Sequence, residues 1–408
     1  MRRPAVALLI ETSNSYARGL LEGIVTYVRA HDPWSIWLPE QRRGESPPEW
    51  LKRWRGDGII ARIETEEIAR LLRRTGLPLV DVSAARPLTT VPWVETDDDA
   101  IARFAVEHLA ERGFRRLAFV GEPQFNWSRF REAGFVTHAQ ALGLDVTIAP
   151  TTRPRGRSQS VDGTSTHLAD WLLRLEKPVG VFCCYDIKAQ QILDLCREQD
   201  LAVPEQVAVI GVDNDPLLCN LCTPPLSSVA PDARRTGYVA AELLERMLRG
   251  EHVPPQPYLI PPLGVETRQS TDTLAIEDED VAQALRFIRE RAREGIDVGD
   301  VLKAVPVSRR VLEARFRKIV GRSPHEEILR VRLHRVRQLL TDTDLSMAEI
   351  AQRTGFRHTE YLSVAFKRAY DVTPSAFRVE HHSAAATGGS RSTSEKSRGT
   401  ARSKVGAS

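Results

Sequence analysis

The apolar residues in the first 270 positions fall into two kinds of segment that alternate along the chain. Short apolar runs have the length of buried β-strands, and the stretches between them carry apolar residues at helical spacing. The predicted strands span residues 5–10, 36–38, 58–61, 79–82, 93–95, 116–120, 179–183, 207–212 and 258–260. The predicted helices span residues 18–30, 66–75, 97–112, 129–142, 164–175, 186–199 and 232–249. This alternation predicts an α/β fold with parallel sheets covered on both faces, and so many units favour two lobes over one sheet.

Residues 281–380 carry a purely helical pattern that is typical of a helix-turn-helix. Two short amphipathic segments, 347–353 and 359–369, are separated by Gly355. Residues 301–320 repeat this plan around a turn at 305–307, and a helix predicted over 324–340 joins the two units. The inner apolar faces of the two second helices are predicted to consist of Val311, Leu312, Phe316 and Ile319, and of Tyr361, Leu362, Ala365 and Phe366.

The outer faces of the two second helices carry hydrogen-bonding and cationic groups that can meet base edges and phosphates in a major groove. The candidates for DNA contact are Ser308, Arg309, Arg310 and Arg315 in the first unit and His358, Thr359, Glu360, Ser363 and Lys367 in the second. A single short match of this kind also arises by chance in helical hairpins, so one unit alone leaves both interpretations open. Two consecutive units favour DNA binding.

The two units and their connecting helix resemble the DNA-binding domain of the AraC/XylS family over about a hundred residues. The matches are Val307-Ser308, Leu312, Arg315-Phe316, Gly321, Ser323-Pro324, Glu349-Ile350-Ala351, Gly355-Phe356, Tyr361, Phe366-Lys367, Thr373-Pro374 and Phe377-Arg378. Pro306 departs from the small residue usual in the first turn, and we expect it to stiffen that turn. The resemblance implies sequence-specific binding to double-stranded operator DNA.

The charge of the chain is divided in a way that fits this interpretation. The formal net charge is only +3, but residues 281–380 hold 20 Lys and Arg against 13 Asp and Glu. Residues 381–408 hold five basic residues against one acidic residue, so the first 280 residues are net acidic. An acidic body joined to a basic end is expected when only that end meets DNA. Residues 381–408 include almost no large apolar residues and are predicted to be disordered.

Polar residues follow several predicted strands, at the edge where open α/β sheets bind ligands. These candidate ligand-binding residues are Ser13, Asn14, Tyr16, Trp127, Arg131, Asp186, Asp213 and Asn214. Carboxylates, amides, an arginine and an aromatic ring together can bind the hydroxyl groups and the apolar side of a small sugar. Asp186 and the residues of 213–215 could instead cap the helices or turns that follow them. Their placement after successive strands favours the sugar site.

Residues 1–270 resemble the periplasmic-binding-protein-like sensor domain of the LacI/GalR family. The resemblance rests on Gly19–Ile24, Gly56–Ile60, Gly76–Val80, Asp97–Asp99, His108–Gly113, Phe119–Gly121, Arg131–Phe135, Cys184–Asp186, Val203-Pro204, Val209–Asn214 and Gly237. It implies a ligand between two lobes, with Arg131, Asp186 and Asp213 on family ligand positions. The DNA-binding headpiece of that family does not precede the first strand, so DNA binding is expected from the C-terminal module.

The predicted organisation is a sensor over residues 1–272, a linker over 273–280, a DNA-binding domain over 281–380 and a tail over 381–408. The combination resembles activators of pentose-utilisation operons, which implies a pentose effector, a homodimer and contact with RNA polymerase. A repressor, another small ligand, a sugar-binding receptor without regulatory activity and a sugar-processing enzyme stay open as alternatives.

Several features argue against other functions. Neither a phosphate-binding glycine loop nor a catalytic signature is found, so we expect neither an enzyme nor a cofactor. The five cysteines form no even framework and are expected to be reduced, and a metal site at Cys219 and Cys222 is disfavoured. No apolar run approaches the ~20 residues of a membrane span. A cytoplasmic protein without a membrane partner is therefore expected.

Overall fold

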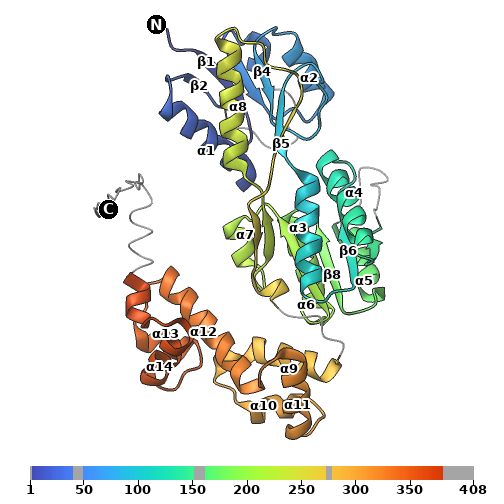
Figure 1. Ribbon diagram of the computed structural model, residues 1–408, viewed down its shortest axis with the longest axis vertical. Helices are drawn as coiled ribbons and strands as arrows, with labels where there is room; N and C mark the ends of the chain where they lie inside the picture. Colours follow the sequence, from blue (N-terminus) through green and yellow to red (C-terminus); the bar gives the residue numbers. More distant parts are fainter. Residues whose placement is uncertain (1, 40–48, 151–160, 273–277, 380–408) are drawn as a thin grey trace, which may run out of the picture. The chain divides into compact units, whose positions relative to one another are not determined.

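The computed structural model describes residues 2–39, 49–150, 161–272 and 278–379. The chain divides into two compact units, Met1–Ala282 and Gln283–Ser408, and each is described by itself (Figure 1). Most of the predicted linker and the whole predicted tail lie outside the described residues, so the predicted domain limits stay a prediction.

The first lobe of unit 1 is built on a six-stranded sheet with the strand order β11-β5-β4-β3-β1-β2, and all its pairs are parallel. Successive side chains of β1 point to opposite faces, as a strand requires. Val6 and Leu8 pack with α1 and α8, whereas Ala7 and Leu9 pack with α2. The elements are β1 Ala5–Leu9, α1 Ser15–Ala30, β2 Ser35–Trp37, η1 Glu49–Arg53, β3 Gly58–Ala61, α2 Glu66–Arg73, β4 Leu79–Asp81, β5 Trp93–Thr96, α8 Ala233–Leu248 and β11 Pro257–Ile260.

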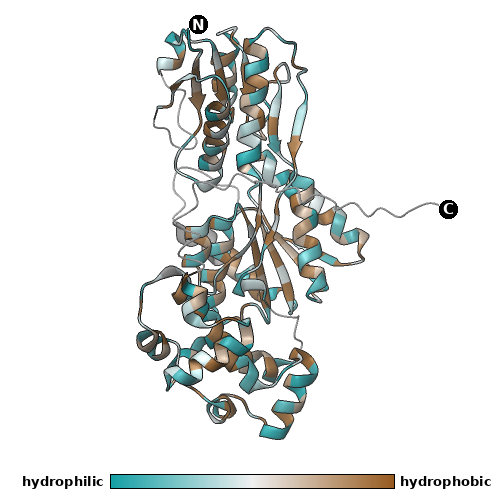
Figure 2. Cartoon of the chain, turned by 60° about the vertical axis from the view of Figure 1, so that its left-hand side comes forward, coloured by the Kyte–Doolittle hydropathy of each residue, from teal (hydrophilic) through white to brown (hydrophobic). Residues whose placement is uncertain are grey.

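The second lobe has its own six-stranded sheet, in the order β12-β10-β9-β8-β6-β7. Only β12 pairs antiparallel with its neighbour. Every residue of β8 and β9 is buried, and Figure 2 shows the hydrophobic strands between helices that are hydrophilic on one side. The elements are α3 Asp98–Glu111, β6 Arg116–Val120, α4 Asn126–Ala141, β7 Asp145–Ile148, α5 Val161–Arg174, β8 Val179–Cys183, α6 Asp186–Glu198, β9 Val207–Val212, α7 Pro216–Leu221, β10 Ser227–Ala230, β12 Gly264–Glu266 and η2 Gln269–Thr271.

Helices α1 and α8 lie side by side because glycines let their backbones touch (Figure 1). A Cβ atom on Gly23 would lie 2.0 Å from the carbonyl oxygen of Arg234, and one on Gly237 would lie 2.0 Å from that of Leu20. Any side chain at either position would force the two helices apart. This packing joins α8, which follows most of the second lobe in the sequence, to the first lobe.

The prediction of two α/β lobes is confirmed, and all nine predicted strands are present within a residue or two of their predicted limits. Three strands were missed: β7, β10 and β12. β7 is largely exposed, and the serines of β10 give no apolar run although they are buried. β12 lies more than thirty residues after β10 and becomes a strand by pairing with it. None of these strands has the local apolar pattern that the prediction requires.

Unit 2 contains two helix-turn-helix motifs joined by a long helix. Its elements are α9 Glu279–Arg291, η3 Ala292–Glu294, α10 Val298–Ala304, α11 Arg309–Val320, α12 Pro324–Asp342, α13 Met347–Arg353 and α14 Thr359–Tyr370. Three of these helices begin with capping boxes, at Asp297, Ser323 and Ser346. In each box a side-chain oxygen accepts a hydrogen bond from an otherwise unsatisfied backbone N–H group. The local sequence therefore sets where these helices start.

The second motif of unit 2 touches the segment that precedes the first motif, through backbone that approaches closely. Gly355 has φ +75°, and a Cβ atom there would lie 2.6 Å from the carbonyl oxygen of Ala292. Arg332 of α12 donates hydrogen bonds to the carbonyl oxygens of Ala292 (2.8 Å) and Ile296 (2.7 Å). Both contacts hold the second motif and the connecting helix against the loop before α10. No described helix has the length and apolar character to cross a membrane.

The predicted inner faces of α11 and α14 are confirmed for Leu312, Phe316, Leu362, Ala365 and Phe366, which are all buried. The prediction was wrong for Tyr361, which is 48% exposed. Its ring lies 5.9 Å from that of Phe356, so it covers the core from outside while the rest of the ring faces solvent. Val311 is likewise 37% exposed.

Candidate functional site

A cavity of about 180 Å³ lies in unit 1 among residues of both lobes. This is below the roughly 300–1,000 Å³ typical of sites for drug-sized ligands, so the space suits a smaller molecule. Seven of the eight predicted ligand residues line it: Ser13, Asn14, Tyr16, Trp127, Arg131, Asp186 and Asp213. They come from loops and helix starts after β1, β6, β8 and β9, which places the cavity at the carboxyl ends of strands. Their binding role stays a prediction.

Arg131 is the central cation of the cavity and is held rigidly on α4. Its Nε donates to Asp98 Oδ1 (2.8 Å) and its Nη1 donates to the carbonyl oxygen of Cys184 (2.6 Å). The guanidinium carbon lies 5.1 Å from the ring centroid of Trp127. Burial lowers the pKa of Arg131, but the carboxylates of Asp98 and Asp213 outweigh this and raise its pKa overall. Arg131 is therefore a buried, charged and oriented donor.

Asp186, the first residue of α6, is a buried carboxylate of the cavity with several hydrogen-bond partners. Its Oδ1 accepts from the hydroxyl of Ser228 (2.6 Å), and its Oδ2 accepts from the backbone N–H of Asp215 (2.9 Å). Burial, followed by the charge of Asp213, raises the pKa of Asp186 to about 7. Asp213 itself has φ +104°, a conformation that L-residues rarely adopt and that often marks a functional turn. This turn brings Asp213 to the cavity beside Asp186.

The first lobe contributes further polar groups to the cavity. Asn14 caps α1, with Oδ1 accepting from the N–H of Ala17 (2.8 Å), and it also lines the cavity. The hydroxyl of Tyr16 hydrogen-bonds Thr96 Oγ1 at 2.9 Å, and burial raises the pKa of Tyr16. Arg62 forms ion pairs with Glu11 and Glu64, but its buried Nε has no hydrogen-bond partner among the described residues.

Asn214 is the one predicted ligand residue that does not line the cavity. Its Oδ1 accepts from Arg268 Nη2 (2.8 Å), and its own N–H donates to Ser228 Oγ (3.0 Å). The positive φ of Asn214, +48°, continues the turn and aims the side chain at Arg268. The prediction took two consecutive residues after β9 as ligand groups, whereas the structure places only Asp213 on the cavity.

Several polar cavity residues were not predicted: Arg62, Ser83, Glu95, Thr96, Asp98 and Tyr185. Arg62, Ser83 and Glu95 lie at the ends of β3, β4 and β5, where the same rule about strand ends could have found them. Asp98 also follows β5 closely, but an acidic residue at the start of a helix is common for local reasons, so its position alone does not single it out. Only its contact with Arg131, 33 residues later, identifies it.

A series of hydrogen bonds leads from the cavity to Thr271, close to the end of the described segment 161–272. Asp186 accepts from Ser228, Ser228 accepts from Asn214, and Asn214 accepts from Arg268. The N–H of Arg268 donates to Ser227 Oγ (2.8 Å), which also accepts from Thr271 Oγ1 (2.7 Å). The cavity is thus connected, through buried or half-buried groups, to the residues that precede the linker.

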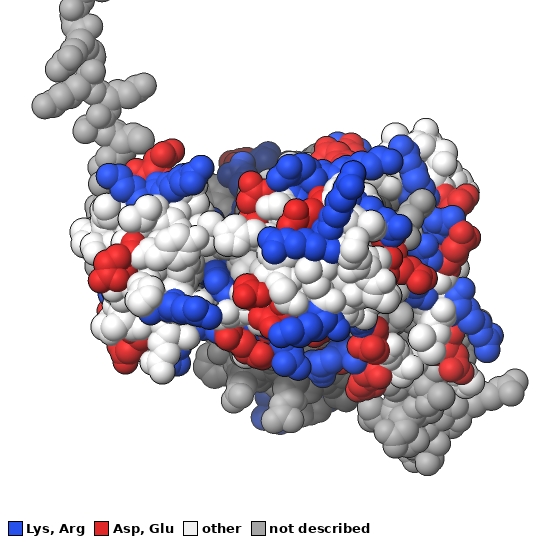
Figure 3. Space-filling model, turned by 90° about the horizontal axis from the view of Figure 1, so that it is seen from below, with Lys and Arg blue, Asp and Glu red and all other residues white. Residues whose placement is uncertain are grey.

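On unit 2, the predicted DNA contacts are accessible. Ser308, Arg309, Arg310, Arg315, His358, Glu360 and Lys367 are exposed, and Thr359 and Ser363 are half-buried. Ser308 also caps α11, where its hydroxyl accepts from the N–H of Val311 at 3.5 Å. Figure 3 looks onto the helical unit and shows Lys and Arg side chains interspersed with Asp and Glu. The contacts with DNA stay predictions.

Comparison with protein families divides the chain in the same way. Residues 5–99 match the XylR N-terminal domain, residues 106–271 a periplasmic binding protein-like domain, and residues 301–380 a helix-turn-helix domain. Together with the two-lobed cavity and the double helix-turn-helix, these matches define a transcription regulator with a sensor domain and an AraC-type DNA-binding domain.

Similar proteins specify the family further. The xylose operon regulatory protein of Escherichia coli is 36% identical over 92% of this chain and 97% of its own length. The protein of the same name from Haemophilus influenzae is 31% identical over 92% of this chain and 98% of its own length. A solved xylose-binding transcription activator matches with a TM-score of 0.81 at 35% identity, covering 93% of this chain and 99% of that one. The chain belongs to the family of xylose operon regulatory proteins.

Proposed function

We propose that a small sugar, with a pentose as the favoured class, binds the cavity of unit 1 and controls binding of unit 2 to operator DNA. The observation that carries this proposal is the Arg131–Asp98 pair against the ring of Trp127. A rigid pair of opposite charges can bind adjacent hydroxyls of a sugar, and an aromatic face can cover its apolar side. The similarity to xylose operon regulatory proteins supports a pentose.

Arg62 adds to this support from the other lobe. Arg62 lines the cavity, and its Nε is buried and unpaired among the described residues; a buried donor without a partner is costly. A sugar hydroxyl would satisfy it. Because Arg62 and Arg131 belong to different lobes, a ligand that binds both favours the closed arrangement of the lobes over the open one, which is the condition for a conformational response.

The response is proposed to travel along the hydrogen bonds from Asp186 to Thr271 and so to the linker. In a homodimer, this would reset the four helix-turn-helix motifs on direct-repeat half-sites. The two motifs of one protomer then read successive major-groove faces about one turn, ~34 Å, apart. We propose that the bound protein activates transcription through contact with RNA polymerase and acts in the cytoplasm, where its operator lies.

The decisive experiment is calorimetric titration of the full chain with a panel of pentoses and hexoses, followed by DNA-binding assays with and without any sugar that binds. The DNA probe is a duplex selected from a randomised library by the full chain. One pentose binding in the micromolar range, together with a sugar-dependent change in DNA affinity, is the expected result. A hexose alone would overturn the assignment to pentoses. No binding across the panel would overturn the sugar site, and a sugar without effect on DNA affinity would overturn the coupling.

A further inference from the structure

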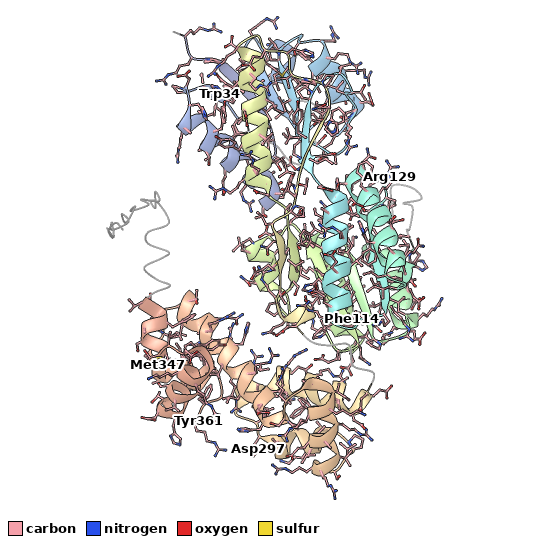
Figure 4. All side chains as sticks on the ribbon, viewed as in Figure 1. Trp34, Phe114, Arg129, Asp297, Met347 and Tyr361 are labelled. Carbon is pink, nitrogen blue, oxygen red and sulfur yellow. The ribbon has the colours of Figure 1, made fainter. Side chains whose placement is uncertain are left out.

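The exposed face of α14 combines two apolar side chains with polar ones. Val364 is 66% exposed and Tyr361, one turn earlier, is 48% exposed. Figure 4 labels Tyr361 on this helix. Glu360 lies four residues before Val364 and Lys367 three residues after it, so all of them share one side of the helix. The opposite side, with Leu362 and Phe366, is buried in the core of unit 2.

Neither packing nor helix propensity explains Val364. It contributes little to the core, because most of its surface is open. A β-branched residue also loses side-chain freedom in a helix and is a poor choice for an exposed helical position. Charged or straight-chain residues would favour the helix more. A solvent-facing valine in the middle of α14 therefore suggests a contact that the chain by itself does not make.

The corresponding helix of the first motif is different in character. The exposed residues of α11 include Arg309, Arg310 and Arg315, and Arg309 is paired with Glu313 at 2.8 Å. Arginines are suited to phosphates and to the O6 and N7 atoms of guanine. The exposed apolar surface of α11 is smaller, with Val311 at 37%. The two recognition helices thus offer different chemistry to a major groove.

The apolar group that a major groove displays is the C5-methyl of thymine, which distinguishes A·T from the other base pairs. Tyr361 is partly held in place by Phe356, with the ring centroids 5.9 Å apart, so its exposed surface is oriented before binding. We infer that Val364, flanked by Tyr361, reads a thymine methyl group, so that α14 selects a T-containing part of the half-site. This inference rests on the proposed function and specifies what the second motif recognises.

The test measures the contribution of single methyl groups. Full-length protein first selects its site from a randomised DNA library, and each thymine of the selected duplex is then replaced in turn by deoxyuridine, which lacks only the methyl. For the wild-type protein, one or two replacements should weaken binding about fourfold each, the effect of removing one buried methyl-sized group. The variant Val364→Ala should bind the thymine and deoxyuridine duplexes equally well.

Two variants serve as controls. Val311→Ala removes the same two methyl groups, but from α11. This variant should keep the full discrimination between thymine and deoxyuridine. Val364→Thr keeps the shape but exchanges one of two methyl groups for a hydroxyl, and should keep only part of the discrimination. Circular dichroism and the affinity for unrelated DNA should be unchanged in all three, because the fold and the phosphate contacts are untouched.

The inference is wrong if no deoxyuridine replacement changes the affinity of the wild-type protein. It is equally wrong if Val364→Ala keeps the wild-type ratio of affinities for the thymine and deoxyuridine duplexes. It is also wrong if Val364→Ala changes the oligomeric state and leaves that ratio unaltered, since Val364 would then contact protein. Failure of the selection itself, with no duplex enriched, would instead contradict the proposed DNA binding.

Discussion

Substitution of Glu327 should destabilise the DNA-binding unit strongly and in a pH-dependent way. Glu327 lies in the first turn of α12, and its side chain is fully buried. Its carboxylate accepts hydrogen bonds from Arg330 Nε and Nη2, both at 2.9 Å, and forms an ion pair with Arg322. Burial works to raise the pKa of Glu327, but Arg330, Arg289 and Arg322 outweigh it and lower the pKa to about 2.

The size of the effect follows from this pKa. A fall from 4.5 to about 2 corresponds to about 3 kcal/mol of stabilisation of the folded state by the ionised carboxylate. Removing one partner of a buried ion pair typically costs roughly 3–5 kcal/mol of folding stability, and the value derived from the pKa of Glu327 agrees with this range. Because the folded pKa lies below the unfolded one, the contribution is complete above about pH 5 and is lost as the pH falls toward 2. Roughly half of it should remain at about pH 3.

The assay is urea unfolding of the full chain for the wild type and Glu327→Gln at several pH values. All seven tryptophans lie at or before Trp171, so their fluorescence reports the sensor unit only. Far-UV circular dichroism reports both units. Near neutral pH, the variant should lose about 3 kcal/mol in the transition seen by circular dichroism alone, with the fluorescence midpoint unchanged.

A matched control is Glu313→Gln, which removes the same charge from a side chain that is 44% exposed in a surface pair with Arg309. It should change the stability by less than about 0.5 kcal/mol. A loss below about 1 kcal/mol for Glu327→Gln would refute the reasoning. The reasoning would also be refuted if the difference in free energy of unfolding between Glu327→Gln and the wild type stayed constant between about pH 5 and pH 3.

Four further predictions concern other parts of the chain. Gly355→Ala should destabilise unit 2 by more than about 2 kcal/mol, because both its φ of +75° and the backbone opposite it exclude a side chain. Gly321→Ala, at φ +77° but with open space around it, should cost only about 1 kcal/mol in the same urea titration, and equal costs would contradict the packing argument. Arg131→Ala should abolish calorimetrically measurable sugar binding while DNA affinity without sugar stays within about twofold of wild type, and an unchanged sugar affinity would remove Arg131 from the site. Arg268→Ala should keep sugar binding but reduce the sugar-dependent change in DNA affinity, because it interrupts the hydrogen bonds between the cavity and Thr271, and a full response would rule out this route. Lys367→Ala should weaken DNA binding and reduce the salt dependence of the binding constant by about one unit of slope, whereas an unchanged slope would exclude a phosphate contact.

The sequence by itself determined the parts of this protein that depend on local pattern. Continuous apolar runs such as β8 and β9 are buried on both faces, and such runs have few alternatives to a central parallel strand. Capping residues such as Ser323 and Ser346 place helix starts through bonds to neighbours three residues away. Because strands of a parallel sheet end at a common edge, the polar residues that follow them could also be assigned to one cavity, and seven of the eight line it.

The tertiary structure alone decided which groups meet across long stretches of chain. Asp98 pairs with Arg131, and Arg268 takes Asn214 away from the cavity, although no spacing or periodicity in the sequence links the two residues of either pair. β12 pairs with β10, and Tyr361 lies against Phe356 with half of its surface exposed, which its helical spacing did not predict. Periodicity and capping are set by residues within a few positions of each other, so a sequence displays them. A hydrogen bond between distant residues depends on how whole helices and strands pack, and it appears only when they have done so.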